Sequence, residues 1–199
     1  MGKEFMNAVE SRRSIYTIGK EVLLSEEKVG DLVRRAVLNA PSAFHSQGAR
    51  VVVLFGEEHE KLWRITEKVL RKVVPEENFP DTKTKLDTIS AGYGTVLYFE
   101  EQSTVRTLQE NYPLYQEEFP VWSLESAGML QYIIWTALEA EGLGASLHHY
   151  DPLIDDEVHE SWNLPKSWKL LGEMPFGSVT AGAKPKANLP IEQRVLIFG

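Results

Sequence analysis

The sequence predicts a single α+β domain over residues 1–199, and three observations lead to that prediction. Segments with helical spacing of apolar residues alternate with short, β-branched apolar runs. No repeat, linker or low-complexity tract divides the chain, and 199 residues can bury a core of useful size. An apolar content of 43% and a charged content of 25% are ordinary for a soluble globular protein.

Two helices are expected first. Apolar residues at helical spacing predict a short helix over residues 3–11. Ser25, followed by two glutamates, predicts the N-cap of a second helix that continues to Asn39. Pro41 then prevents the helix from continuing.

The next part of the chain is expected to form two strands and the segments between them. Continuous apolar runs predict buried strands over residues 51–55 and 94–99. Residues 57–72 predict an amphipathic, charged helix. Residues 75–90 are polar and contain two prolines, which indicates an exposed loop leading into a short helix.

The helix predicted over residues 121–141 has an unusual composition. Residues 103–120, before it, are expected to be helical in part, with an aromatic end broken by prolines. Apolar side chains cover nearly the whole circumference of the predicted helix, and such a helix is buried on all sides. In a chain of this size, the pattern indicates either a central helix or one packed against a second subunit.

Shorter elements complete the chain. Gly142 and Gly144 end the long helix, and residues 154–162 predict another helix. Residues 168–174 and 195–198 predict strands, and residues 184–186 lie in a loop between them.

Charge and cysteine content exclude several kinds of partner and chemistry. A net charge of -8 and a pI near 5.2 argue against a nucleic acid or an anionic membrane surface as a partner. No apolar run is long enough to span a bilayer, and the first ten residues have no apolar core of a secretory signal. The absence of cysteine excludes disulfides, thiolate nucleophiles and Cys-ligated metals, and it fits a reducing compartment, which predicts a cytoplasmic protein.

Arg12, Arg13 and Ser14 are adjacent in this acidic chain. Two arginines supply planar forks of donors and a serine adds a hydroxyl, which together suit a doubly charged anion such as a phosphate monoester. The alternative is that both arginines are solvated on a turn after the first helix.

Two other polar segments could contribute to a site. Residues 40–47 lie between a helix and a buried strand, where polar groups can face a ligand, although an ordinary turn explains them equally well. His148 and His149 are neighbours in an extended stretch and point to opposite sides, so no metal site is expected. Lys85 and the lysines at 184 and 186 are most simply solvated loop charges.

The order of these segments resembles that of the nitroreductase family of FMN-dependent oxidoreductases. The matching pieces extend over nearly the whole chain. They are residues 11–14, 40–47, 91–97, 142–147 and 174–177, and the last three are similar to the short subgroup that includes the yeast fatty-acid-repression protein and bacterial stress-induced nitroreductases.

The resemblance implies an FMN phosphate site at the arginines. Arg12, Arg13 and Ser14 would hold the phosphate and the ribityl chain, and Lys184 and Lys186 would complete the phosphate site. A phosphate with a charge near -2 needs several cationic or N–H donors when it is partly buried.

The same resemblance implies contacts with the isoalloxazine ring. Pro41 and Ser42 would lie against one face, with His45 and Gln47 near the flavin edge. The family usually has asparagine where His45 stands.

A second group of implied contacts is on the polar side of the ring. Lys85 would approach N1 and O2, where a cation favours hydride acceptance. The backbone around Leu147, His148 and His149 would donate to N5 and O4. The subgroup favours glutamine where His148 occurs.

An aromatic substrate pocket is a further expectation. Phe44, Tyr112, Tyr115 and Phe119 are candidates for stacking against a flat substrate, although packing in the core explains each of them as easily.

The family's activity and assembly follow from the resemblance. It implies an NAD(P)H oxidoreductase that reduces nitroaromatic or quinone-type acceptors by alternating hydride transfer through flavin N5. It also implies a mostly antiparallel sheet flanked by helices, in an intertwined homodimer whose C-terminal strand joins the partner's sheet. The alternative function is a flavin-binding or redox-sensing regulatory protein with little turnover.

Overall fold

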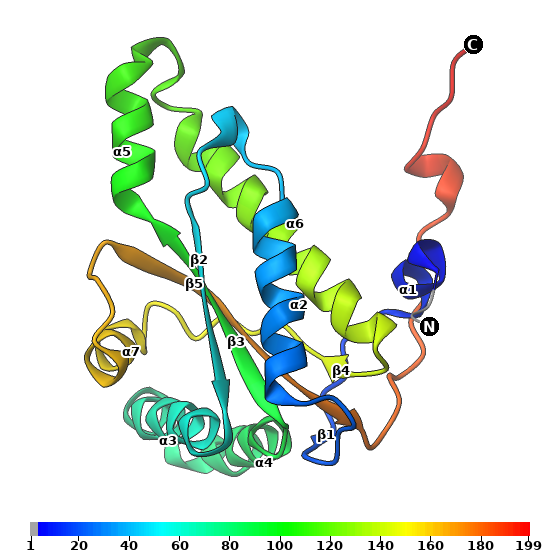
Figure 1. Ribbon diagram of the computed structural model, residues 1–199. Helices are drawn as coiled ribbons and strands as arrows, with labels where there is room; N and C mark the ends of the chain where they lie inside the picture. Colours follow the sequence, from blue (N-terminus) through cyan, green and yellow to red (C-terminus); the bar gives the residue numbers. More distant parts are fainter. Residues whose placement is uncertain (1–3) are drawn as a thin grey trace.

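The computed structural model describes residues 4–199, in which seven α-helices surround one five-stranded sheet (Figure 1). The strand order is β1-β5-β3-β2, with β4 also paired to β5, and every one of these strand pairs is antiparallel. The strands are β1 (Ile18–Gly19), β2 (Ala49–Phe55), β3 (Gly94–Glu101), β4 (Gly144–Ala145) and β5 (Trp168–Val179). The predicted α+β class and antiparallel sheet are confirmed.

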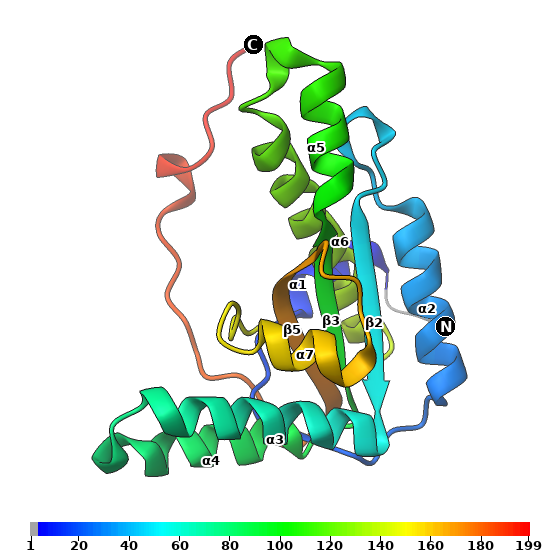
Figure 2. The same cartoon turned by 90° about the vertical axis from the view of Figure 1, so that its left-hand side faces the viewer.

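Helices cover both faces of the sheet. They are α1 (Phe5–Ser11), α2 (Glu26–Asn39), α3 (Gly56–Val73), α4 (Phe79–Ser90), α5 (Gln102–Asn111), α6 (Phe119–Ala140) and α7 (Asp155–Trp162). Figure 1 shows α2 and α6 side by side on one face, and Figure 2 shows α3, α4 and α7 on the other. The sheet is therefore the middle layer of three.

The central strand β3 joins two hydrophobic cores, and all eight of its residues are buried. Side chains alternate along a strand, so Leu97 and Phe99 pack against α3, α4 and α7. Val96 and Tyr98 face the opposite way, against α2 and α6.

Most predicted elements are present, with changed boundaries. Ser25 caps α2 as predicted, its Oγ accepting from Lys28 N–H at 3.3 Å. The first predicted helix begins at Phe5 within the described residues, and Lys3 lies outside them. The strand predicted over 168–174 continues to Val179, since its last residues pair with β1 and β4.

The prediction of an exposed loop before a short helix over residues 75–90 is largely wrong. A helical turn at residues 76–78 leads directly into the 12-residue helix α4. Pro80 lies in the first turn of α4, where its missing N–H has no helical partner to lose. Phe79, Leu86 and Ile89 are buried and fix the helix against the core.

Helix α6 is not buried on all sides in the single chain. Leu130, Ile134 and Leu138 are buried on one side. Large apolar side chains are exposed elsewhere on the helix: Val121, Leu124, Met129 and Tyr132. The expected burial on all sides is therefore wrong for one chain, and a second subunit remains the alternative.

The chain after β5 leaves the body of the molecule, as Figure 2 shows. Residues 195–198 form no strand in the single chain, contrary to the prediction, because no other strand lies beside them. Ile197 and Phe198 are 90% and 89% exposed. Exchange of this segment with a partner subunit stays a prediction. No helix within residues 4–199 has the length and apolar content needed to cross a membrane.

Candidate functional site

The predicted anion-binding residues lie where the chain leaves α1. Arg12 is the C-cap of that helix, and its backbone N–H donates to Ala8 O at 3.0 Å. Ser14 then forms a parallel bridge with Ala145. The backbone around Arg13 is thus held between a helix end and the sheet.

The two arginine side chains have different neighbours. Arg13 Nη2 donates to the backbone oxygen of Lys184 at 2.6 Å and so joins two distant parts of the chain. The Arg12 guanidinium carbon lies 4.4 Å from the centre of the Trp135 ring, and its Nε is buried without a hydrogen-bond partner in the described chain. These residues form what we call the arginine cluster: Arg12, Arg13, Ser14 and Lys184.

Residues 147–150 run antiparallel to β5. His148 and Glu173 exchange two backbone hydrogen bonds, of 2.8 and 2.9 Å, and Tyr150 N–H donates to Glu173 Oε2 at 3.0 Å. Because N–H groups alternate along an extended segment, those of Leu147 and His149 are directed to the other side. Residues 147–150, whose backbone is predicted to face the ligand, are therefore hydrogen-bonded to β5 at His148 and Tyr150.

The His148 imidazole is buried behind this segment. Its Nε2 lies 2.8 Å from Ser146 Oγ, and its ring stacks on that of Tyr150 with centres 6.0 Å apart. Burial lowers the pKa of His148 to about 4, so the imidazole is neutral near pH 7. Within residues 4–199 no group of three metal-ligating side chains could hold a metal ion.

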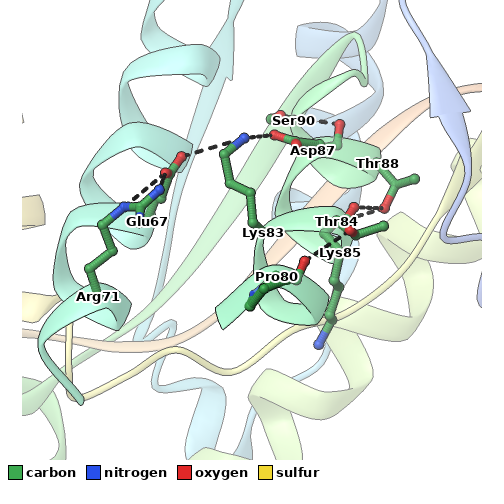
Figure 3. Close-up of polar contacts among 9 residues, drawn as sticks. All are labelled: Glu67, Arg71, Pro80, Lys83, Thr84, Lys85, Asp87, Thr88 and Ser90. Carbon is green, nitrogen blue, oxygen red and sulfur yellow. Dashed lines mark hydrogen bonds and ion pairs between the residues drawn. The ribbon is translucent and has the colours of Figure 1, made fainter. Parts of the chain in front are cut away.

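Lys85 reaches the end of the same segment from α4. Figure 3 shows Lys83 directed at Glu67 and Asp87, with which it forms ion pairs, whereas Lys85 extends from another side of the helix. Lys85 Nζ lies 5.7 Å from the centre of the Tyr150 ring. A cation thus lies beside residues 147–150, and its approach to flavin N1 and O2 stays a prediction. Lys186 is exposed in the loop after β5.

A strained turn follows α2 at the second predicted segment. Ser42 Oγ accepts from Gln47 N–H at 3.0 Å and closes the turn that Pro41 begins. Phe44, His45 and Gln47 have positive φ angles of 55°, 51° and 51°. Each such non-glycine residue costs about 1 kcal/mol or more, and such strain is concentrated at ligand sites.

The four predicted substrate-pocket residues come together at this turn. The ring of Phe44 is 5.0 Å from Tyr112 and 5.3 Å from Phe119, measured between centres. Trp122 lies almost parallel to Phe44, at 15° and 6.1 Å. Phe119 is buried beneath the others, which are partly exposed. We call these five residues the aromatic cluster: Phe44, Tyr112, Tyr115, Phe119 and Trp122.

A groove of about 1080 Å³ runs from the turn along the free edge of β2, between α2 and α6. Pro41, Ser42, His45 and Gln47 line one end. No residue of the arginine cluster lines it.

The two groups of predicted residues are far apart in one chain (Figure 1). Arg12 packs on Trp135 near the C-terminal end of α6, whereas Phe44 packs on Trp122 near its N-terminal end. At about 1.5 Å per residue, the two contact points are roughly 20 Å apart along the helix. A single chain therefore does not bring residues 41–47 to the arginine cluster.

Sequence reasoning missed three side chains at these places: Trp122, Trp135 and Glu173. The two tryptophans were assigned only to an apolar helix. Glu173 could have been noticed as one acidic residue inside the apolar run of the predicted strand at 168–174.

The sequence is similar to those of known proteins. Residues 9–178 match the Nitroreductase family. The chain is similar to nitroreductase FRM2 of Saccharomyces cerevisiae, with 30% identity over 185 residues, 89% of each chain.

Three solved structures are similar to this chain. Nitroreductase CinD from Lactococcus lactis, in complex with chloramphenicol, is 41% identical with a TM-score of 0.90, covering 98% of this chain and 100% of CinD. CinD has also been solved with 4-nitrophenol. A protein from Exiguobacterium sibiricum in complex with FMN is 17% identical with a TM-score of 0.72, covering 100% of this chain and 99% of that one, and shares the fold.

Proposed function

Because the chain belongs to the nitroreductase family, we propose that it is an FMN-dependent NAD(P)H oxidoreductase that reduces nitroaromatic or quinone-type acceptors. One observation carries the proposal. The arginine cluster, residues 147–150 and Lys85 form a continuous series of contacts, through Ser14 to Ala145 and through Tyr150. Arginine side chains, the backbone amides of Leu147 and His149, and the Lys85 ammonium thus lie along one path.

The residues present fit an FMN phosphate. Arg13 and Arg12 supply guanidinium donors, and Ser14 supplies a hydroxyl. The buried Nε of Arg12 has no partner in the described chain, so a phosphate oxygen would satisfy a donor that the protein leaves unused. Lys186, which is exposed in the loop after β5, adds a further cation.

The residues present also fit the polar edge of a flavin ring. Bound FMN would accept a hydride from NADH or NADPH and pass it to the oxidant. The backbone of Leu147 and His149 orients the ring without adding a titrating group. Lys85 places positive charge near the segment and favours electron uptake there.

The acceptor class rests on the aromatic cluster and on CinD. Exposed rings of Phe44, Tyr112 and Tyr115 offer stacking surfaces for a flat oxidant. Two of the CinD ligands, chloramphenicol and 4-nitrophenol, carry a nitroaromatic ring, and a third, nicotinic acid, is a flat aromatic acid. We propose that this chain also takes flat aromatic oxidants, nitroaromatic compounds among them.

A homodimer would bring the two separated groups together. Residues 41–47 and the aromatic cluster of one subunit would then face the arginine cluster of the other. The apolar face of α6 and the free edge of β2 are suitable contact surfaces, and residues 195–198 have the length of a short strand. We propose that the partner's C-terminal segment occupies the groove beside β2.

Reduction of the purified holoprotein tests this function. The protein should be yellow, lose its flavin absorbance on anaerobic addition of NADH or NADPH, and regain it on addition of 4-nitrophenol or a quinone. A protein that binds FMN but is bleached by neither nucleotide is instead a flavin-binding regulatory protein. A protein that binds no flavin contradicts both.

A further inference from the structure

Glu173 is an acidic residue in the hydrophobic interior of the molecule. It lies in β5, opposite Leu97 of β3, and its side chain is 0% exposed. In residues 4–199 its carboxyl group forms no ion pair, and its Oε2 accepts a hydrogen bond from Tyr150 N–H. The other oxygen, Oε1, is buried with no partner.

A carboxylate in that environment is strongly disfavoured. Taking a charge out of water without a cation or several donors costs several kcal/mol, whereas a neutral carboxylic acid avoids most of this cost. The nearby charges act in the same direction, since Asp151 and Asp155 are both acidic. Lys85 Nζ lies 5.7 Å from the centre of the Tyr150 ring and forms no ion pair with Glu173 in the described chain.

The position of Glu173 connects it to the backbone that faces the proposed ligand. Its main chain exchanges two hydrogen bonds with His148, and its side chain holds the amide of Tyr150. Residues 147–150 are therefore fixed at alternate amides from the β5 side. The amides of Leu147 and His149, which alternate with these, are directed to the opposite side.

We propose that Glu173 is a positioning residue which, as a neutral carboxylic acid, holds residues 147–150 in the conformation that presents their backbone to the flavin. The identity of the ligand, FMN, rests on the proposed function, whereas the contacts of Glu173 with residues 147–150 do not depend on it. When Glu173 loses its proton, a negative charge appears behind the flavin-facing segment. Electron uptake by the flavin then becomes less favourable.

Glu173 titrates in a different pH range from His148 and Tyr150. Burial raises the pKa of Glu173 to about 8, with Asp151 and Asp155 adding to the effect. The pKa of His148 is lowered to about 4, and that of Tyr150 is raised to about 12, both mainly by burial. A transition near pH 8 can therefore be assigned by comparison with a variant that cannot ionise.

Amide hydrogen exchange in the FMN-free protein tests the positioning role. Glu173→Gln keeps an oxygen that can accept from Tyr150 N–H, whereas Glu173→Leu removes it. The Leu variant should exchange the Tyr150 amide about tenfold faster, the effect of losing one hydrogen bond, and the Gln variant should stay near wild type. The His148 amide, which bonds to main chain, is the internal control. Equal Tyr150 exchange in all three proteins would overturn the positioning role.

The potential of bound FMN tests the titrating role. From pH 6 to pH 9 the potential of the wild type should fall below that of Glu173→Gln by a growing amount, with the change centred near pH 8. The Glu173→Gln protein is the reference because it binds the same flavin and cannot ionise at this position. If the potentials of the two proteins change with pH in the same way, Glu173 does not act as a neutral acid that loses its proton near pH 8. If no variant binds FMN, the proposed function fails while the exchange experiment still decides the positioning role.

Discussion

Arg12 lies with its guanidinium over Trp135 and its Nε buried without a partner in the described chain. An arginine stacked on an indole keeps its charge and loses little freedom when it binds an anion. Glu173 is an acidic residue at the other end of the series of contacts that begins at the arginine cluster, and it is buried beside residues 147–150. At the scale of single residues, the proposed site is marked by ionisable groups whose hydrogen bonding is incomplete in the described chain.

Replacing Arg12 tests the phosphate site. Arg12→Ala should weaken FMN binding by about 10- to 100-fold, since a charge-assisted hydrogen bond contributes about 1.5–3 kcal/mol. Arg35→Ala is the matched control, because Arg35 is an exposed arginine on α2. Fluorescence titration of the FMN-free proteins measures both. Equal affinities in the two variants would show that Arg12 is not a phosphate ligand.

Glu173 also predicts how stability depends on pH. Its pKa is about 8 in the folded protein against an ordinary value of 4.5, so the folded state keeps a proton that the unfolded chain releases. The free energy of unfolding contributed by this group falls as the pH rises from about 4.5 to about 8 and is level above that range.

Glu173→Gln removes that dependence. As the pH rises from 5 to 8.5, the free energy of unfolding of the variant should increase relative to that of the wild type by on the order of 2–4 kcal/mol. Urea unfolding of both proteins at the two pH values measures the gain, and contributions of His59 and His148 cancel in the comparison. If the two proteins differ in free energy of unfolding by the same amount at both pH values, Glu173 does not ionise between them.

At the scale of elements, two surfaces have no covering in the single chain. One is the exposed apolar face of α6, and the other is the free edge of β2 beside the groove. An unpaired sheet edge next to an apolar face is a surface on which another strand can pair. Residues 195–198 are exposed and apolar, so they match both surfaces.

Truncation tests this pairing. Removing residues 190–199 should leave a folded chain, because these residues are exposed and lie outside both cores. It should also shift the protein toward monomer and weaken FMN binding. Light scattering coupled to size exclusion measures the first effect, with circular dichroism as the check on folding. A truncated protein that stays fully dimeric would refute the exchange of the C-terminal segment.

The aromatic cluster makes a prediction about substrates. Phe44→Ala should raise KM for 4-nitrophenol by about tenfold, because one stacking contact contributes roughly 0.5–1.5 kcal/mol and area burial adds to it. Leu114→Ala is the control, since Leu114 is 85% exposed in the same segment as Tyr112 and Tyr115. Steady-state kinetics compares them. Similar KM values for the two variants would remove Phe44 from the pocket.

At the scale of the whole molecule, local patterns predicted the fold and the order of the site segments. Arg12, residues 40–47 and residues 142–147 are contiguous motifs, so the sequence is sufficient to find them. Trp135 beneath Arg12 and Glu173 beside Tyr150 depend on how distant elements pack, and no local pattern specifies either. The left-handed turn at Phe44 has no glycine to indicate it.

The separation of the two groups was also beyond sequence reasoning. Residues 41–47 and the arginine cluster lie near opposite ends of α6, and only coordinates give that distance. A flavin site built from both groups requires two subunits. We therefore propose that FMN binds between two chains and not within one.

Native mass spectrometry of the FMN-loaded protein tests this claim most directly. The account predicts a species of two chains with two FMN molecules, and monomer released by dilution should carry none. A monomer that retains FMN would contradict it.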